Sequence, residues 1–114
     1  MTTVGSQDLC ADLAQALREF WEDYTGVRPA HVQVLAGERA IAVWLEQVLS
    51  PAQRQLASTQ AGRKMLQELE EHILEQARPY FQQLVEGATE RVGIRVAVHA
   101  DVASGSILGF FRLE

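Results

Sequence analysis

The stretch "LSPAQRQLASTQAGRKMLQEL", residues 49–69, opens with a strong helix start signal. Ser50 supplies an N-cap hydroxyl, and Pro51 fits the first helical position, where its missing N–H leaves no bond unmade. Gln53 stands at the reciprocal position of a capping box. We therefore predict that a long helix begins at Ser50, between two segments that are rich in β-branched residues.

The middle of this stretch predicts a second helix start. Ser58 or Thr59 can cap a new helical segment, so an interruption is expected close to Gly62. A Walker-type phosphate loop is absent, because that motif needs a second glycine before the Gly-Lys step. Exposed amides at this helix start could still bind a small anion with the help of Thr59, Arg63 and Lys64, although basic residues there are more often only solvated.

The long helix is expected to run to about Ala88, with a second interruption at Pro79, where a backbone hydrogen bond is lost. Apolar residues recur along it at helical spacing and predict the buried stripe. The residues of this predicted stripe are Met65, Leu66, Leu69, Ile73, Ala77, Tyr80, Phe81, Leu84 and Val85.

The segments on either side of this helix complete the predicted fold. Helical spacing predicts a first helix over residues 6–24, which Gly26 would end. Alternating or β-branched patterns predict two hairpins. Their strands are residues 31–36, 40–49, 94–102 and 107–113. Both helices can bury their apolar stripes together on one face of a four-stranded antiparallel sheet. We therefore predict an α+β two-layer sandwich in α-β-β-α-β-β order.

Composition limits the classes of function. The chain has 114 residues, 47% of them hydrophobic, which suits one domain over residues 1–114. Its net charge of -5 argues against binding to nucleic acid or to an anionic membrane surface. No apolar run approaches the length of a bilayer span and no secretory signal is present, so we expect a cytoplasmic protein without direct membrane insertion.

Two readings of the exposed sheet face remain open. Arg95, His99 and Asp101 share one face of their strand, and Trp44 and Phe110 belong to the same face of neighbouring strands. If Arg95, His99 and Trp44 were adjacent, they would form a platform for a small anion or metabolite. The favoured reading is that Trp44 and Phe110 form a homodimer interface, because they would otherwise leave an apolar patch in water.

No cofactor, metal or catalytic group is expected. Glu68, His72 and Glu75 fall on the side of the helix away from the predicted stripe, which is typical of a solvated surface rather than a metal site. Cys10 has no histidine near it in sequence, and the His-x-Asp pair on the third strand lacks a positioned nucleophile. We therefore predict that the protein is not an enzyme.

Several separated motifs also resemble those of one family. The run over residues 43–86 contains Leu49-Ser-Pro-Ala, Thr59-x-x-Gly-Arg and Ala77-Arg-Pro, and the strand that follows contains His99-x-Asp. This pattern is similar to that of the MpsC-like domains, a bacterial family of unknown function named for its association with a sodium-translocating, membrane-potential-generating system.

The resemblance covers nearly the whole chain, but it implies no catalytic residue for this chain. It implies a regulator or partner protein that is linked, in some members, to membrane transport of sodium or inorganic carbon. Together with the residue patterns, it leads us to expect an interaction domain that forms a homodimer and acts through a protein partner such as a membrane transporter.

Overall fold

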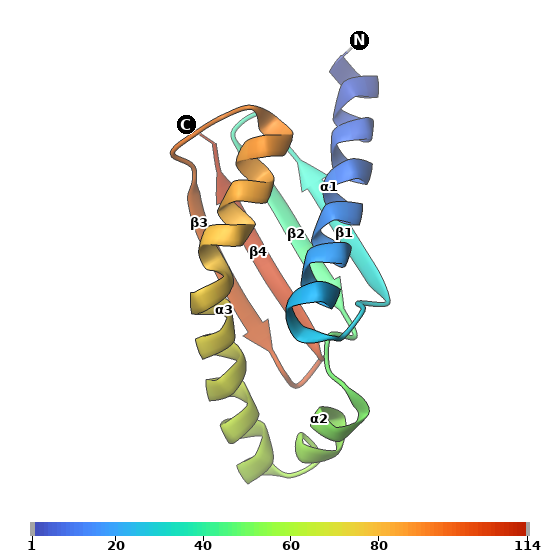
Figure 1. The fold of residues 1–114 in the computed structure, drawn as a ribbon, viewed down its shortest axis with the longest axis vertical. Coiled ribbons are helices and arrows are strands. Elements are labelled where there is room, and N and C mark those ends of the chain that lie inside the picture. The colour runs from blue at the N-terminus through green and yellow to red at the C-terminus, as the bar shows by residue number, and fades with distance from the viewer. Residues whose placement is uncertain (1, 114) are drawn as a thin grey trace.

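The computed structural model describes residues 2–113 and contains one four-stranded sheet with three helices (Figure 1). The elements in chain order are α1 (Thr2–Thr25), β1 (His31–Ala36), β2 (Ala40–Glu46), α2 (Pro51–Leu56), α3 (Gln60–Thr89), β3 (Arg95–Asp101) and β4 (Ser106–Arg112). The sheet order is β1-β2-β4-β3, with every neighbouring pair antiparallel. The prediction of an α+β fold with a four-stranded antiparallel sheet is confirmed, and α2 is an additional element in the order.

Alternation along the strands separates a buried face from an open one. Val43 in β2 pairs with Gly109 in β4, which in turn pairs with Val98 in β3, and all three are buried. α1 packs beside β1 and α3 beside β3, so both helices lie over this face (Figure 1). Gly109 keeps the centre of the face flat, because a Cβ there would lie 2.8 Å from Val43 Cγ2.

The junction between α2 and α3 confirms both predicted helix starts. Ser50 and Gln53 form the reciprocal capping box of α2. Thr59 caps α3 and accepts a hydrogen bond from the Gly62 amide at 3.0 Å. Gly62 is more than a weak point in the helix, because a Cβ at this position would overlap the carbonyl oxygen of Leu56. The two helices therefore meet through a backbone contact that only glycine permits.

Two predictions about α3 are wrong. The helix continues through Pro79 without interruption, because Pro79 and Glu75 are exposed and water can satisfy the carbonyl that proline leaves free. The predicted apolar stripe was too wide, since Met65, Leu69 and Tyr80 are exposed. The helix meets the sheet along a narrower row, which is Gly62, Leu66, Glu70, Leu74, Ala77, Phe81 and Val85.

Strand ends are shorter than predicted around the first hairpin. β2 stops at Glu46 instead of residue 49, because Gln47 takes a left-handed backbone conformation with φ 57°. Val48 and Leu49 then enter the core beneath α2. Gly26, with φ +81°, follows the last residue of α1, as expected for a helix-ending glycine.

Candidate functional site

The first candidate site is the sheet face that none of α1, α2 and α3 covers, which we call the open face. The strand register arranges its side chains in rows across the four strands. One central row is Gln33, Trp44, Leu108 and His99, and the next is Leu35, Ala42, Phe110 and Ala97.

Apolar side chains occupy the centre of the open face. Leu35, Leu108 and Phe110 are 53%, 48% and 50% exposed, and Trp44 is half-buried. Trp44, Leu108 and Phe110 line a shallow hollow of about 240 Å³. Large side chains exposed to this degree on neighbouring strands form a contiguous apolar patch, which is a common mark of a contact surface.

Opposite charges lie at the two ends of the open face. Arg95 of β3 pairs in register with Arg112 of β4 at one end. At the other end, Glu46 of β2 and Asp101 of β3 flank Ser106 of β4. Asp101 accepts a hydrogen bond from the Ser104 hydroxyl at 2.9 Å, which holds the turn between β3 and β4. The face therefore changes from basic to acidic along the strand direction.

The structure brings the proposed anion platform together only in part: Trp44 and His99 line the same hollow, and Arg95 does not. Leu108 stands between Trp44 and His99 in the central row, so these two residues are two strand spacings, about 10 Å, apart. Arg95 and His99 are four residues apart along β3, about 13 Å, with Ala97 between them. All of these residues do lie on the open face, as predicted. Trp44 and Phe110, the predicted interface residues, are diagonal neighbours.

Two of the three residues of the second predicted anion site, Thr59 and Arg63, already make hydrogen bonds within the chain. Thr59 caps α3, and Arg63 donates from Nη1 to the Ala57 carbonyl oxygen at 3.0 Å. Lys64 is exposed one residue further along α3. Thr59 and Arg63 therefore hold the junction of α2 and α3 together.

The acidic side of α3 includes one residue with a structural role. Glu68, His72 and Glu75 are exposed, as predicted. Glu71 instead accepts a hydrogen bond from the backbone N–H of Ala100 at 3.2 Å. Over residues 2–113, no group of three or more His, Cys, Asp or Glu side chains is placed to hold a metal ion.

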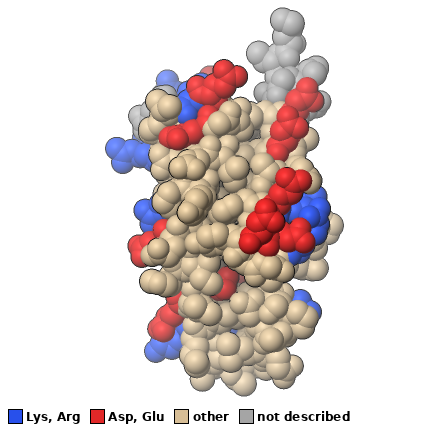
Figure 2. All heavy atoms as spheres, viewed as in Figure 1, with Lys and Arg blue, Asp and Glu red and all other residues tan. Residues whose placement is uncertain are grey.

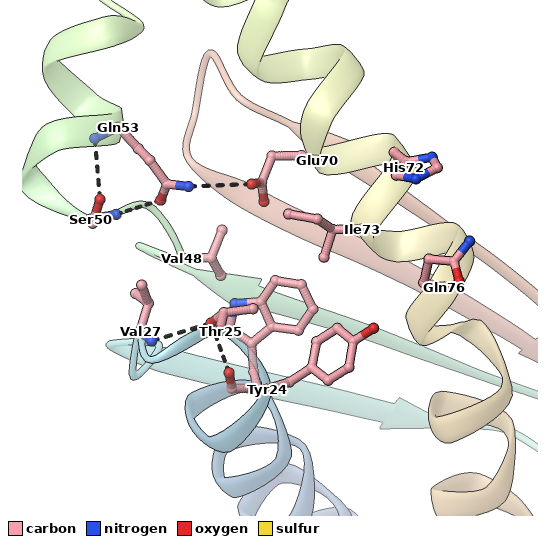
Figure 3. A pocket seen from close by; sticks show the side chains of 11 residues that line it. Tyr24, Thr25, Val27, Val48, Ser50, Gln53, Glu70, His72, Ile73 and Gln76 are labelled. Atoms are coloured by element: carbon pink, nitrogen blue, oxygen red, sulfur yellow. Dashed lines mark hydrogen bonds between the residues drawn. The ribbon is translucent and has the colours of Figure 1, made fainter.

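A second candidate site, which we call the helix cavity, lies among α1, α2 and α3 (Figure 3). Its volume is about 360 Å³. The lining residues are Trp21, Tyr24, Thr25, Val27, Val48, Ser50, Gln53, Glu70, His72, Ile73 and Gln76. On this side of the molecule the charged side chains lie mostly toward the margins, with uncharged surface between them (Figure 2).

Glu70 is the distinctive residue of the helix cavity. It is 3% exposed, and its side chain points from α3 toward Gln53 of α2 (Figure 3). Gln53 Nε2 donates to Glu70 Oε2 over a long 3.5 Å. Burial raises the pKa of the Glu70 carboxyl above its ordinary value of 4.5, because removal from water disfavours the charged form.

Trp21 lines the same cavity and carries a buried donor that makes no hydrogen bond. Its side chain is 1% exposed, and its indole N–H has no hydrogen-bond partner among the described residues. Buried donors of this kind are uncommon, because an unmade hydrogen bond costs about 1–3 kcal/mol.

The sequence interpretation missed Glu70 and the cavity. One signal was available: Glu70 is four residues after Leu66 and four before Leu74, so helical spacing places it within a buried row. Its neighbours Glu68, Glu71 and Glu75 made it resemble part of a solvated face. Trp21 follows Leu13 and Leu17 at helical spacing, which predicts burial, but nothing in that spacing indicates an unpaired N–H.

Comparison with known proteins agrees with the motif pattern described above. No curated protein and no solved structure matches the chain. Over residues 2–113, no helix combines the length and the apolar character that crossing a membrane requires. The family described as "Na+-translocating membrane potential-generating system (MpsC)" has a model that matches residues 6–114. Because the match spans nearly the whole chain, this protein belongs to the MpsC family.

Proposed function

We propose that this protein is a non-enzymatic interaction domain that pairs with a second copy of itself through the open face. The carrying observation is the central apolar patch of Leu35, Leu108, Phe110 and Trp44. Burial of such side chains contributes about 25 cal/mol for each Å² of apolar surface removed from water. A sheet face with this centre and a charged border has the general anatomy of a protein interface.

The charge distribution supports a second copy as the occupant. In a face-to-face pair related by a two-fold axis perpendicular to the strands, the basic end of one copy meets the acidic end of the other. Arg95 and Arg112 would then approach Glu46 and Asp101 of the partner copy. An interface of this kind is self-complementary, as two-fold symmetry requires.

The family supports a place for this dimer beside a membrane transport system. Its description refers to a sodium-translocating system that generates membrane potential. We propose that the dimer is cytoplasmic and regulates such a system by binding a transport protein, since no described helix is suited to span the bilayer itself.

Molar mass in solution tests the dimer. Light scattering after size-exclusion chromatography should give twice the chain mass at tens of micromolar, and Phe110→Glu should give the monomer mass, because each copy would place a charge inside the apolar patch. Val92→Glu is the matched control, since Val92 is 85% exposed and lies outside the sheet. A monomeric wild type, or a Phe110→Glu protein that stays dimeric, would overturn the proposal.

A further inference from the structure

The helix cavity lies on the side of the sheet opposite the open face, so the proposed dimer leaves it accessible. Tyr24, His72 and Gln76 line it and are exposed, which opens the cavity to solvent. His72 points away from Glu70 (Figure 3). The interior of the cavity is therefore defined by its buried residues.

Most polar groups of the interior already have partners within the chain. The Thr25 hydroxyl donates to the Trp21 carbonyl oxygen at 2.8 Å and accepts from the Val27 amide at 3.2 Å. Ser50 and Gln53 satisfy each other in the capping box. These groups fix the ends of α1 and α2, and they leave little hydrogen-bonding capacity for a ligand.

One buried group retains that capacity. Within residues 2–113, the Gln53 contact at 3.5 Å is the one hydrogen bond shown to the Glu70 carboxyl, which can accept several. The Trp21 indole N–H also lacks a partner in the described part of the chain, but its nitrogen is buried out of reach of solvent, so a ligand in the cavity does not contact it. A complementary ligand must therefore supply N–H donors to Glu70.

The walls narrow the choice of ligand further. Trp21 and Tyr24 present aromatic rings with centroids 6.3 Å apart, and Val27, Val48 and Ile73 add apolar surface. Aromatic faces beside a carboxylate favour a positively charged nitrogen over an anion. A bare metal ion fits poorly, because one carboxylate among apolar walls cannot supply the six or so oxygens that hard cations take.

We propose that the helix cavity binds a small organic ammonium compound, whose N–H groups donate to the Glu70 carboxyl. Amino alcohols and amino amides are small compounds of this class. The cavity volume is at the lower end of the range for small-molecule sites, which suits a ligand of a few heavy atoms.

Indole N–H signals provide a direct test, because the chain contains two tryptophans, Trp21 and Trp44, and Trp44→Phe assigns their two cross-peaks. In ¹H–¹⁵N spectra of the whole chain, ethanolamine or glycinamide hydrochloride should move the Trp21 cross-peak saturably and leave that of Trp44 in place. Tetramethylammonium chloride, which lacks N–H groups, should move the Trp21 cross-peak far less at equal concentration, and sodium chloride should leave both cross-peaks in place.

Glu70→Gln tests the role of the carboxylate and should weaken the apparent affinity at least tenfold. Glu68→Gln is the control, because Glu68 is exposed on the same helix outside the cavity and its loss should change nothing. The proposal is overturned if neither probe moves the Trp21 signal, which would leave Gln53 as the partner of Glu70. It also fails if tetramethylammonium moves the Trp21 cross-peak as much as the two probes do. The same holds if Glu70→Gln binds the probes with the affinity of the wild type.

Discussion

Gln67 of α3 donates its side-chain amide to the carbonyl oxygen of Ala100 in β3, with Nε2 and O 2.6 Å apart. Its Oε1 atom accepts from the Val102 amide at 3.3 Å, and Glu71 accepts from the Ala100 amide at 3.2 Å. β3 is an edge strand, whose outward backbone groups would otherwise be free to pair with another chain. Two side chains of one helix therefore satisfy the backbone at the C-terminal end of this edge strand.

Gln67→Ala should lower the free energy of unfolding by about 1 kcal/mol, because the Ala100 carbonyl in β3 and the Val102 amide just after it lose their partners. Urea unfolding followed by circular dichroism measures the change. Gln83→Ala, an exposed change on the same helix, should shift the free energy by less than about 0.5 kcal/mol. Equal effects of the two substitutions would show that the edge contact contributes no stability.

Gly62→Ala and Gly87→Ala should have opposite effects although both lie in α3. A Cβ at position 62 would overlap the Leu56 carbonyl oxygen, so Gly62→Ala should cost about 1–3 kcal/mol despite the better helix propensity of alanine. A Cβ at Gly87 meets no atom within 4 Å, and Gly87→Ala should stabilise by about 0.5 kcal/mol. Melting temperatures of the two proteins, compared with the wild type, check the signs.

The pH dependence of stability should change when Glu70 is replaced by glutamine. Because the pKa of Glu70 is raised in the folded state, the folded protein holds its proton more tightly than the unfolded chain does. Its contribution to stability is therefore complete below pH 4.5 and is lost as the pH rises through the higher folded value. The other titratable side chains that line the cavity are His72 and Tyr24.

Glu70→Gln should consequently gain stability relative to the wild type as the pH rises above this range, since glutamine has no charge to bury. Denaturant midpoints of both proteins at pH 4, 6 and 8 give the comparison. A difference that stays constant with pH would mean that Glu70 titrates alike in the folded and unfolded chains.

Charge reversal should test the orientation of the proposed dimer. Glu46→Lys places a lysine opposite the basic end of the partner copy and should weaken dimerisation. Adding Arg112→Glu in the same chain should recover part of the loss, because the two ends exchange signs. Sedimentation equilibrium gives the dissociation constants. If the double variant is no tighter than Glu46→Lys alone, the two copies do not meet in this orientation.

Local signals predicted the parts of the fold that depend on local hydrogen bonds. Ser50 and Thr59 each satisfy an amide three residues away, so their positions could be inferred from the sequence. The strand order could not, because the paired residues of β2 and β4 are sixty or more positions apart in the chain. The separation of Trp44 from His99 by Leu108 follows from that order and was equally hidden.

The same distinction between local and long-range information applies to the two candidate sites. Alternation along the strands placed Trp44, Phe110 and Arg95 on one face, because the period of a strand is local. The helix cavity depends on three helices meeting around Glu70, and no single segment contains that information.

The change from arginine to carboxylate along the open face should also affect the rate at which the proposed dimer forms. The two ends give the face a dipole along its strands, which can orient an approaching partner before any side chains touch. Added salt should therefore slow the encounter, while the lifetime of the complex depends mainly on the apolar centre. In the proposed dimer, the charged border residues would set the direction of approach, and Phe110 and its neighbours would set the lifetime of the complex.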